Sequence, residues 1–363
     1  MIRFHDVHKV YDDGTVAIDR LDLDVPPGTL TVFVGPSGCG KTTSMRMINR
    51  MAEPSSGKVV VDGADVAGVD PVRLRLGIGY VIQGAGLMPH QRVIDNVATV
   101  PVLTGQTRRA ARKAAYAVLE RVGLDAKLAD RYPAQLSGGE QQRVGVARAL
   151  AADPPILLMD EPFSAVDPIV RHELQREILR LQAELHKTIV FVTHDIDEAI
   201  RLADRVAVFG RGGVLQQYDE PAQLLSRPAN DFVARMIGAG RGYRWLQFLD
   251  ATDLPLHDIP TITEVAGDEQ LRDGWALAVK ADGTPLGWID ADGVRKHRGG
   301  AALRDSVTSV GAVFRPGANL SQALDAALSS PAAMGVAVDG AGKVTGGVRA
   351  ADVLAALDSH RRN

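Results

Sequence analysis

A glycine-rich turn between a predicted strand and a predicted helix has the composition of a phosphate-binding loop. The segment "TVFVGPSGCGKTTSMRMI", from residue 31, contains the pattern G-x-x-x-x-G-K-[ST]. We expect Lys41 to reach the β- and γ-phosphates of a nucleotide and the Thr42 hydroxyl to hold Mg²⁺. A coincidental turn is the weaker interpretation, because the strand and the helix both flank it. The expected phosphate contacts are Gly35, Pro36, Ser37, Gly38, Cys39, Gly40, Lys41, Thr42 and Thr43.

Cys39, the one cysteine of the sequence, lies inside this turn. It has no partner for an internal disulfide, and the N-terminus of the following helix could lower the pKa of its thiol. A small side chain that fills a variable position of the turn is an equally good interpretation.

Two adjacent carboxylates follow a second apolar run, "ILLMDEP", which places Asp160 and Glu161 at the carboxyl end of a buried strand. Ligands bind at this edge in open α/β sheets. Asp160 suits the shell of a Mg²⁺ ion, and Glu161 suits a general base for water. A third run, "TIVFVTHD", ends in His194, whose imidazole could hydrogen-bond a γ-phosphate oxygen or the attacking water. Taken alone, Asp160 and Glu161 would be a common strand-to-loop sequence and His194 a structural histidine. Because all three lie at strand ends, we favour a catalytic role for them.

A second phosphate-binding element is predicted in "LSGGEQQRVGVARAL", residues 136–150. Ser137, Gly138 and Gly139 open an amphipathic helix, whose first N–H groups and dipole can bind a phosphate. The chain therefore carries two such elements, far apart in the sequence.

An α/β fold is predicted to position these residues. From Ile2 to about Ile237, short β-branched runs alternate with helical patterns, as is typical of a buried parallel sheet. The likeliest buried strands are predicted at 31–34, 156–159, 188–192 and 205–209.

A helical subdomain is predicted over about 93–150, because the strand pattern disappears after Val93. One helical stripe in it comprises Ala111, Ala115, Val118, Leu119 and Val122. Four basic residues lie off this stripe. We interpret them as a solvated helix surface rather than a membrane-facing patch. These bases are Arg108, Arg109, Arg112 and Lys113.

The sequence changes character after a glycine-rich linker predicted at 238–245. A second domain, 246–363, is predicted to contain short strands punctuated by Asp-Gly turns. "VKADGTPLGWIDADGV" from Val279 resembles "VDGAGKVTGGVRAADV" from Val338, which lies 59 residues later. This offset indicates an internal duplication.

Composition narrows the function classes. The 363 residues are 45% hydrophobic and 23% charged, with a net charge of −3, so we expect a soluble protein and no nucleic-acid partner. We see no signal peptide in the first residues and no apolar run of about 20 residues, so a cytoplasmic location is expected. Any membrane role would then require a partner.

The motifs together resemble the nucleotide-binding subunit of ABC transporters over residues 1–237. They are Gly35 to Thr42, Gln83, "LSGGE" at 136–140, "LLMDE" at 157–161, "SAVD" at 164–167 and His194, in that order. The resemblance implies a P-loop NTPase cassette with a helical subdomain that binds ATP and Mg²⁺. It also implies two copies packed head to tail, in which the 136–150 helix of one copy completes the ATP site of the other.

The resemblance further assigns roles by position. Tyr11 would stack on adenine, and Gln83 would touch Mg²⁺ and the attacking water, with its loop sensing the permease. Ser137 and the backbone of Gly139 would contact the γ-phosphate of the other copy, and Asp167 would cross the dimer interface. Glu140 stands where glutamine is common, a variant familiar in importer ATPases.

"YVIQGAGLMPHQRVIDNVATVP" and the C-terminal extension are most similar to the ATPase of osmoprotectant importers, which move glycine betaine, choline, proline or related amines. This similarity implies a membrane permease partner, an extracellular substrate-binding protein as an indirect partner, and a peripheral location on the inner face of the cell membrane. The alternatives are an importer of another small solute, such as an amino acid or polyamine, a soluble ABC ATPase clamp, and a sensor whose tail is its main functional part.

In the same group the C-terminal extension is a pair of CBS modules, so a smaller α+β domain of degenerate CBS-like modules is expected. Its first repeat offers little room for a helix between "PTITEVA" and "WALAV". Nucleotide-binding modules place Ser or Thr three residues before an Asp, where this chain has Arg349 before Asp352, and Asp290 and Gly293 in the first repeat. We therefore expect a packing or regulatory module rather than a nucleotide site.

Overall fold

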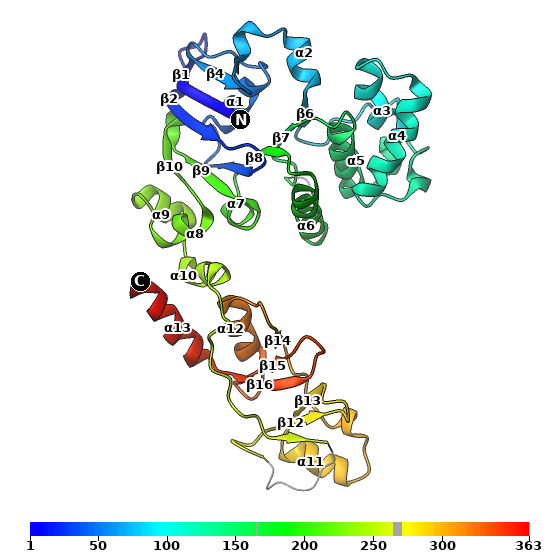
Figure 1. The fold of residues 1–363 in the computed structure, drawn as a ribbon, viewed down its shortest axis with the longest axis vertical. Coiled ribbons are helices and arrows are strands. Elements are labelled where there is room, and N and C mark those ends of the chain that lie inside the picture. Colours follow the sequence, from blue (N-terminus) through cyan, green and yellow to red (C-terminus); the bar gives the residue numbers. More distant parts are fainter. Residues whose placement is uncertain (165, 264–270, 363) are drawn as a thin grey trace. The chain divides into compact units, whose positions relative to one another are not determined.

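A computed structural model describes residues 1–164, 166–263 and 271–362. The chain divides into two compact units, Met1–Gly238 and Ala239–Asn363, which are described separately. Figure 1 shows the elements of both units along the chain.

The centre of the first unit is a six-stranded sheet in the order β10-β9-β3-β8-β7-β6. All neighbours pair in parallel except β10 with β9. Every residue of β3, β7 and β8 is buried, because these strands are apolar on both faces, as a covered parallel sheet requires. The strands are β3 (Leu30–Val34), β6 (Ile78–Val81), β7 (Ile156–Asp160), β8 (Thr188–Thr193), β9 (Arg205–Phe209) and β10 (Leu215–Asp219). The four strands predicted from the sequence are confirmed.

A second, antiparallel sheet in the order β2-β1-β4-β5 packs against the first. Rings from both sheets meet in their common core, where Phe4 contacts Phe33 edge to face and Phe33 contacts Phe209. The strands are β1 (Ile2–Val10), β2 (Val16–Val25), β4 (Ser56–Val61) and β5 (Ala64–Asp65).

Three helices form the expected helical subdomain, α3 (Val93–Leu103), α4 (Arg108–Arg121) and α5 (Gly138–Leu150). Figure 1 shows them together, in cyan to green. The apolar stripe of α4 is buried against its neighbours at Ala111, Ala115 and Leu119. Of the four basic residues off this stripe, Arg112 donates two hydrogen bonds of 2.8 Å to Asp95 of α3, which joins the two helices.

The remaining helices of this unit connect the strands or cover the sheet. They are α1 (Lys41–Ile48), α2 (Pro71–Leu76), α6 (Pro168–Leu185), α7 (Ile196–Leu202), α8 (Pro221–Ser226) and α9 (Asp231–Ile237). Among the helices in the described residues, none combines the length and the apolar character that crossing a bilayer demands.

The second unit consists of two similar halves. Strands β15 and β16 begin at residues 335 and 344, 59 positions after β12 and β13 at 276 and 285. Both hairpins shift register at equivalent places, between Ala278 and Val279 and between Ala337 and Val338. Each half adds one parallel strand to its hairpin, and the strands are β11 (Thr261–Ile262), β12 (Ala276–Val279), β13 (Pro285–Ile289), β14 (Val313–Phe314), β15 (Gly335–Val338) and β16 (Val344–Val348).

Helices complete the second unit: α10 (Arg241–Trp245), α11 (Ala291–Arg298), α12 (Leu320–Ser329) and α13 (Ala350–Arg362). The expected linker thus contains α10, and Trp245 packs on the core formed by Leu246, Leu320 and Val353. The segment expected to be too short for a helix overlaps residues 264–270, which lie outside the described residues.

Candidate functional site

The glycine-rich turn after β3 depends on glycine at two positions. Gly40 has φ of 91°, and a Cβ there would lie 2.4 Å from the Ala17 carbonyl oxygen. Gly35 is equally constrained, because its Cβ would lie 2.4 Å from the carbonyl oxygen of Phe209. Gly38 has φ of 74° and an open surrounding. The turn can therefore bring backbone N–H groups close to a phosphate.

Lys41 begins helix α1 and reaches back over the turn. Its Nζ donates hydrogen bonds to the carbonyl oxygens of Gly35, at 2.7 Å, and Pro36, at 2.9 Å, and its side chain is buried. An ammonium group enclosed by a glycine turn can exchange carbonyl partners for phosphate oxygens.

The Cys39 side chain is buried beneath this turn, with its Sγ 3.7 Å from Lys41 Nζ. This side chain belongs to the hydrophobic core between the two sheets. Burial raises the pKa of the Cys39 thiol, although Lys41 acts in the opposite direction. The expectation that the helix N-terminus lowers this pKa is therefore wrong, and the small-residue interpretation holds; only the backbone of Cys39 is available to a ligand.

Thr42 and Asp160 come together across the sheet edge. The Thr42 hydroxyl donates to Asp160 Oδ1 over 2.9 Å, and Asp160 is buried. Neighbouring oxygens around a Mg²⁺ ion, each at about 2.0–2.1 Å from it in an octahedron, lie at about this separation. Mg²⁺ is commonly held by one or two protein groups plus phosphates and water. The pair fits such an ion, although no group of three His, Cys, Asp or Glu side chains suited to a metal occurs in the described part of the chain.

Two residues that sequence reasoning missed surround the same carboxylate. The Tyr80 hydroxyl lies 3.5 Å from Asp160 Oδ2, and a guanidinium nitrogen of Arg46 lies 3.8 Å from that oxygen. Burial raises the pKa of the Tyr80 phenol, so this hydroxyl is a proton donor at neutral pH. No local pattern marks Tyr80, because its contact depends on β6 lying beside the strand that ends at Asp160.

Glu161 and His194 meet at the ends of adjacent strands. His194 Nδ1 lies 3.2 Å from Glu161 Oε2, and the imidazole is 58% exposed. Glu161 has φ of 43°, a left-handed conformation that a glutamate adopts only when its surroundings fix it. Its N–H donates to the carbonyl oxygen of Val192 over 3.0 Å, which provides one such restraint. The structure therefore brings the expected base and the expected histidine together.

Tyr11 is placed at the rim of the turn. Its hydroxyl is 3.1 Å from the Thr43 hydroxyl, and the Lys9 ammonium lies over its ring at 5.1 Å. The ring is 43% exposed, so one face remains open to a planar ligand. Ser37, by contrast, is exposed at the tip of the turn.

The loop after β6 carries Gln83, whose side chain is exposed. In the described part of the chain no hydrogen bond joins Gln83 to Thr42 or Asp160. The loop continues with Gly84, Ala85 and Gly86, all of which have positive φ. Arg148 of α5 donates to the carbonyl oxygens of Ala85, at 2.9 Å, and Gly86, at 2.7 Å. The loop is thereby attached to α5.

The opposite end of α5 carries the second predicted phosphate-binding element. Ser137 caps this helix, and its hydroxyl and N–H both donate to Glu140 Oε2, at 2.8 and 2.7 Å. Gly139 follows in the first turn, where a Cβ would lie 2.5 Å from Val170 Cγ1. Asp167, three residues before Val170, is exposed and caps α6 through a 2.9 Å bond from the Ile169 N–H.

The predicted residues thus form separate groups in one chain. The first group contains Lys41 and the pair of Thr42 with Asp160, with Thr43 and Tyr11 at its rim. The second group contains Glu161 and His194. The third joins the start of α5 to the start of α6, next to Asp167. No hydrogen bond or ion pair connects the third group to the first two among the described residues. The 137–139 element does not complete the site of its own chain.

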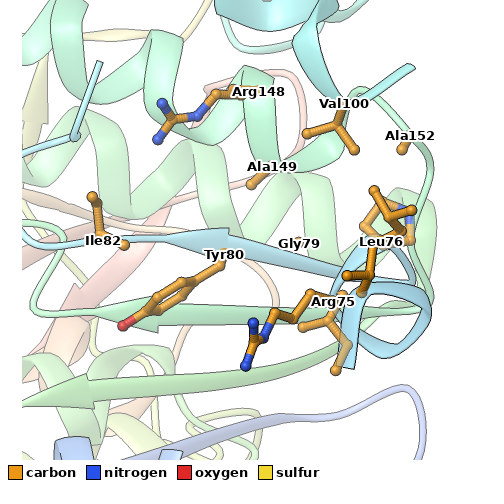
Figure 2. A pocket seen from close by; sticks show the side chains of 12 residues that line it. Arg75, Leu76, Gly79, Tyr80, Ile82, Val100, Arg148, Ala149 and Ala152 are labelled. Atoms are coloured by element: carbon orange, nitrogen blue, oxygen red, sulfur yellow. The ribbon is translucent and has the colours of Figure 1, made fainter. Parts of the chain in front are cut away.

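A groove lies along β6, between α2, α3 and the end of α5. It has a volume of about 360 Å³ and is lined largely by apolar side chains, with Arg75 and Arg148 among them. Figure 2 shows Tyr80 of β6, Ile82 just after it, Val100 of α3 and Arg148 of α5 at this groove. Two residues of the groove therefore also contact the site region: Tyr80 at Asp160, and Arg148 at the Gln83 loop.

Comparisons with known proteins give related sequences and folds. A family model described as "ABC transporter" matches residues 18–164. The glycine betaine/carnitine/choline transport ATP-binding protein OpuCA of Bacillus subtilis (strain 168) is 42% identical over 325 residues, which are 87% of this chain and 83% of that protein. The osmoprotectant import ATP-binding protein OsmV of Salmonella typhimurium is 44% identical over 293 residues, 78% of this chain and 76% of that protein.

Among solved structures, the dimeric post-hydrolysis state of the ATP-binding cassette MJ0796 bound to ADP and Pi superimposes with a TM-score of 0.56 at 31% identity. It covers 61% of this chain and 99% of that one. The match supports the fold of a cassette for the first unit.

Proposed function

This chain belongs to the ATP-binding proteins of ABC transporters, in the group that serves osmoprotectant uptake, and we propose that it powers import of a compatible solute by closing and reopening a dimer of two copies. As an ATPase, it converts phosphate chemistry into motion of a partner. The 2.9 Å contact between Thr42 and Asp160 carries the proposal for the nucleotide site, because two oxygens at this separation match neighbouring ligands of a Mg²⁺ ion.

Each remaining role follows from one of the groups described above. Lys41 binds the β- and γ-phosphates, Tyr11 stacks on adenine, and Mg²⁺, when bound, offsets the phosphate charge beside Thr42 and Asp160. Glu161 polarises the attacking water and His194 holds the γ-phosphate side of the site. Gln83 approaches the same water when its loop moves.

The second copy supplies what the first lacks. Ser137 and Gly139 are at the surface, apart from the nucleotide turn of their own chain, and Asp167 lies beside them. A head-to-tail pair would place this group over the γ-phosphate of the other copy. The dimeric state of the MJ0796 cassette supports this arrangement.

The groove along β6 is the proposed docking site for the membrane permease. An apolar groove of about 360 Å³ accepts a short helix of a partner, and its wall residues Tyr80 and Arg148 reach the metal carboxylate and the Gln83 loop. A displacement in the permease would thus be felt at the nucleotide site. Through this contact the chain is held at the inner face of the cell membrane, and an extracellular substrate-binding protein acts on it indirectly.

The cargo is proposed from the relatives. Their names give glycine betaine, carnitine and choline, so the solute is a small quaternary ammonium compound or a related osmolyte such as proline. The alternative is an importer of an amino acid or polyamine. This alternative stays open because the transported solute need not touch the ATPase. A soluble clamp is a weaker alternative, since the groove along β6 suits a fixed partner.

The second unit is proposed to be a degenerate CBS-like pair that regulates the ATPase. Asp352 is bonded to His257 Nε2 over 2.8 Å, so its carboxylate is already used within the unit. We therefore propose that it binds no adenine nucleotide there. Removing residues 239–363 should leave ATP hydrolysis active and change how uptake responds to ionic strength; an unchanged response would refute the regulatory role.

The test of the function is radiolabelled glycine betaine uptake at high osmolarity in cells that lack the gene. Wild type should restore uptake, Glu161→Gln should not, and Glu120→Gln, which removes an exposed carboxylate of α4, should restore it. Purified Glu161→Gln should bind ATP and lose about 10²- to 10⁴-fold in turnover, the usual share of a general base.

Each contrary result has a separate meaning. Uptake by the Glu161→Gln variant would refute the role of the base. Uptake that is independent of the gene, together with normal ATPase activity of the purified protein, would refute the cargo and leave the ATPase assignment in place.

A further inference from the structure

The start of α5 contains a small hydrogen-bond cluster between Ser137, a residue of the proposed ATP site, and Glu140, which has no role in that site so far. The Ser137 hydroxyl donates to Glu140 Oε2 over 2.8 Å, and the Ser137 N–H donates to the same oxygen over 2.7 Å. In return the Glu140 N–H donates to Ser137 Oγ over 3.3 Å. Both residues therefore satisfy each other, as in a capping box.

This arrangement occupies the proton of the Ser137 hydroxyl. A hydroxyl has one proton to donate, and here it points to a carboxylate. A phosphate oxygen can only accept hydrogen bonds, so Ser137 can bind a γ-phosphate only after its proton leaves Glu140. The bond between Ser137 and Glu140 thus competes with the contact that the dimer requires.

Glu140 also adds a negative charge at the same place. Hydrogen bonds from Ser137 lower the pKa of the Glu140 carboxyl, so it is ionised at neutral pH. The carboxylate suits the positive end of the α5 dipole. A γ-phosphate approaching Ser137 would meet it as a like charge, and salt screens such repulsion at partly exposed positions.

We propose that Glu140 is a positioning residue that holds the Ser137 hydroxyl away from the γ-phosphate and thereby sets how tightly ATP closes the dimer. The inference rests on the proposed head-to-tail site. A glutamine at this position would keep the cap through its carbonyl oxygen, but these uncharged hydrogen bonds are weaker, so the Ser137 hydroxyl would turn to a phosphate more easily, and the negative charge would be gone. Glu140 therefore weakens the ATP-bound dimer and makes it easier to open. Because salt screens the repulsion, the dimer becomes tighter as ionic strength rises.

The test measures ATP-dependent dimerisation of the full chain by sedimentation, with Glu161→Gln as the background that stops hydrolysis. Adding Glu140→Gln should tighten the dimer by about 10-fold or more near 0.02 M salt, and by less than about 3-fold near 1 M salt. Glu120→Gln, the matched charge removal on α4, should stay within about 2-fold of the background at both salt concentrations. In a Ser137→Ala background the gain from Glu140→Gln should be smaller.

The outcomes separate the inference from the proposed function. An ATP-dependent dimer that ignores Glu140→Gln at low salt would overturn the inference alone, as would an equal gain with and without the Ser137 hydroxyl. If the Glu161→Gln chain forms no dimer with ATP, the proposed dimer fails and the inference fails with it. Circular dichroism and thermal unfolding of each variant check that α5 remains folded.

Discussion

The guanidinium of Arg148 donates a hydrogen bond to the carbonyl oxygen of Ala85, 2.9 Å away, and a second one of 2.7 Å reaches the next residue, Gly86. This contact joins the loop of Gln83 to the helix that begins at Ser137. The loop proposed to sense the permease and the helix proposed to meet the second copy are therefore connected through one side chain.

We expect Arg148→Ala to lower the free energy of unfolding by about 1–3 kcal/mol, because two carbonyl oxygens of a left-handed loop lose their donors. Urea unfolding measures the change. Arg20→Ala, which removes an exposed ion pair with Asp6, is the control and should change stability by less than about 1 kcal/mol. Equal effects of the two substitutions would contradict the role of the loop contact.

Gly139→Ala should lower ATP turnover and stability, because the new methyl group would lie 2.5 Å from Val170 Cγ1. Adding Val170→Ala should recover stability by removing that clash, with a change of about 1–3 kcal/mol between the single and the double variant. Thermal unfolding and ATPase assays follow the two effects. Stability that stays low in the double variant would place the strain elsewhere.

Glu198→Gln should make the protein more stable than wild type at neutral pH, with a gain that fades towards pH 4. Glu198 is buried, Thr193 donates to it over 2.6 Å and Arg171 lies 3.9 Å away, yet burial raises the pKa of the Glu198 carboxyl. The folded state then binds a proton more tightly than the unfolded state. The stability that wild type gains from proton binding at Glu198 is complete below the unfolded pKa of about 4.3 and is lost as pH rises through the folded pKa.

Urea unfolding of wild type and Glu198→Gln between pH 4 and 8 tests this sign. A difference between the two proteins that is constant with pH would show that Glu198 does not titrate differently in the folded state.

Cys39 should react with iodoacetamide at least about 100-fold more slowly in the native chain than in urea, because its thiol is buried and reaction requires local opening. The raised pKa acts in the same direction, since less thiolate is present at a given pH. Mass spectrometry of timed samples, with glutathione as the reference thiol, gives the rates. Rapid labelling of the native chain would contradict the buried position.

Local patterns were sufficient where the chemistry depends on neighbours in sequence. The turn from Gly35 to Thr42 could be predicted because its glycines and its lysine are fixed by one backbone path between a strand and a helix. The apolar runs that end at Asp160 and His194 predicted two strand ends in the same way, and the structure shows that these strands, β7 and β8, are neighbours.

Contacts between distant segments were not predictable from these patterns. Tyr80 reaches Asp160 from the neighbouring strand β6, and Arg148 reaches Ala85 from another subdomain. Neither pair has a local signal that depends on the partner. The sequence left two interpretations of Cys39 open, because the helix N-terminus is visible in the sequence, whereas the core that encloses the thiol forms from two sheets.

The place of β6 in the sheet bears on how force can pass through the molecule. Among the described residues it is an edge strand that pairs with β7 alone, and its chain continues directly into the Gln83 loop. A pull on this strand works against a single ladder of hydrogen bonds, whereas the same pull on β8 would work against two. We therefore expect a load applied at the groove to move β6 and the Gln83 loop before it moves the end of β8 at His194.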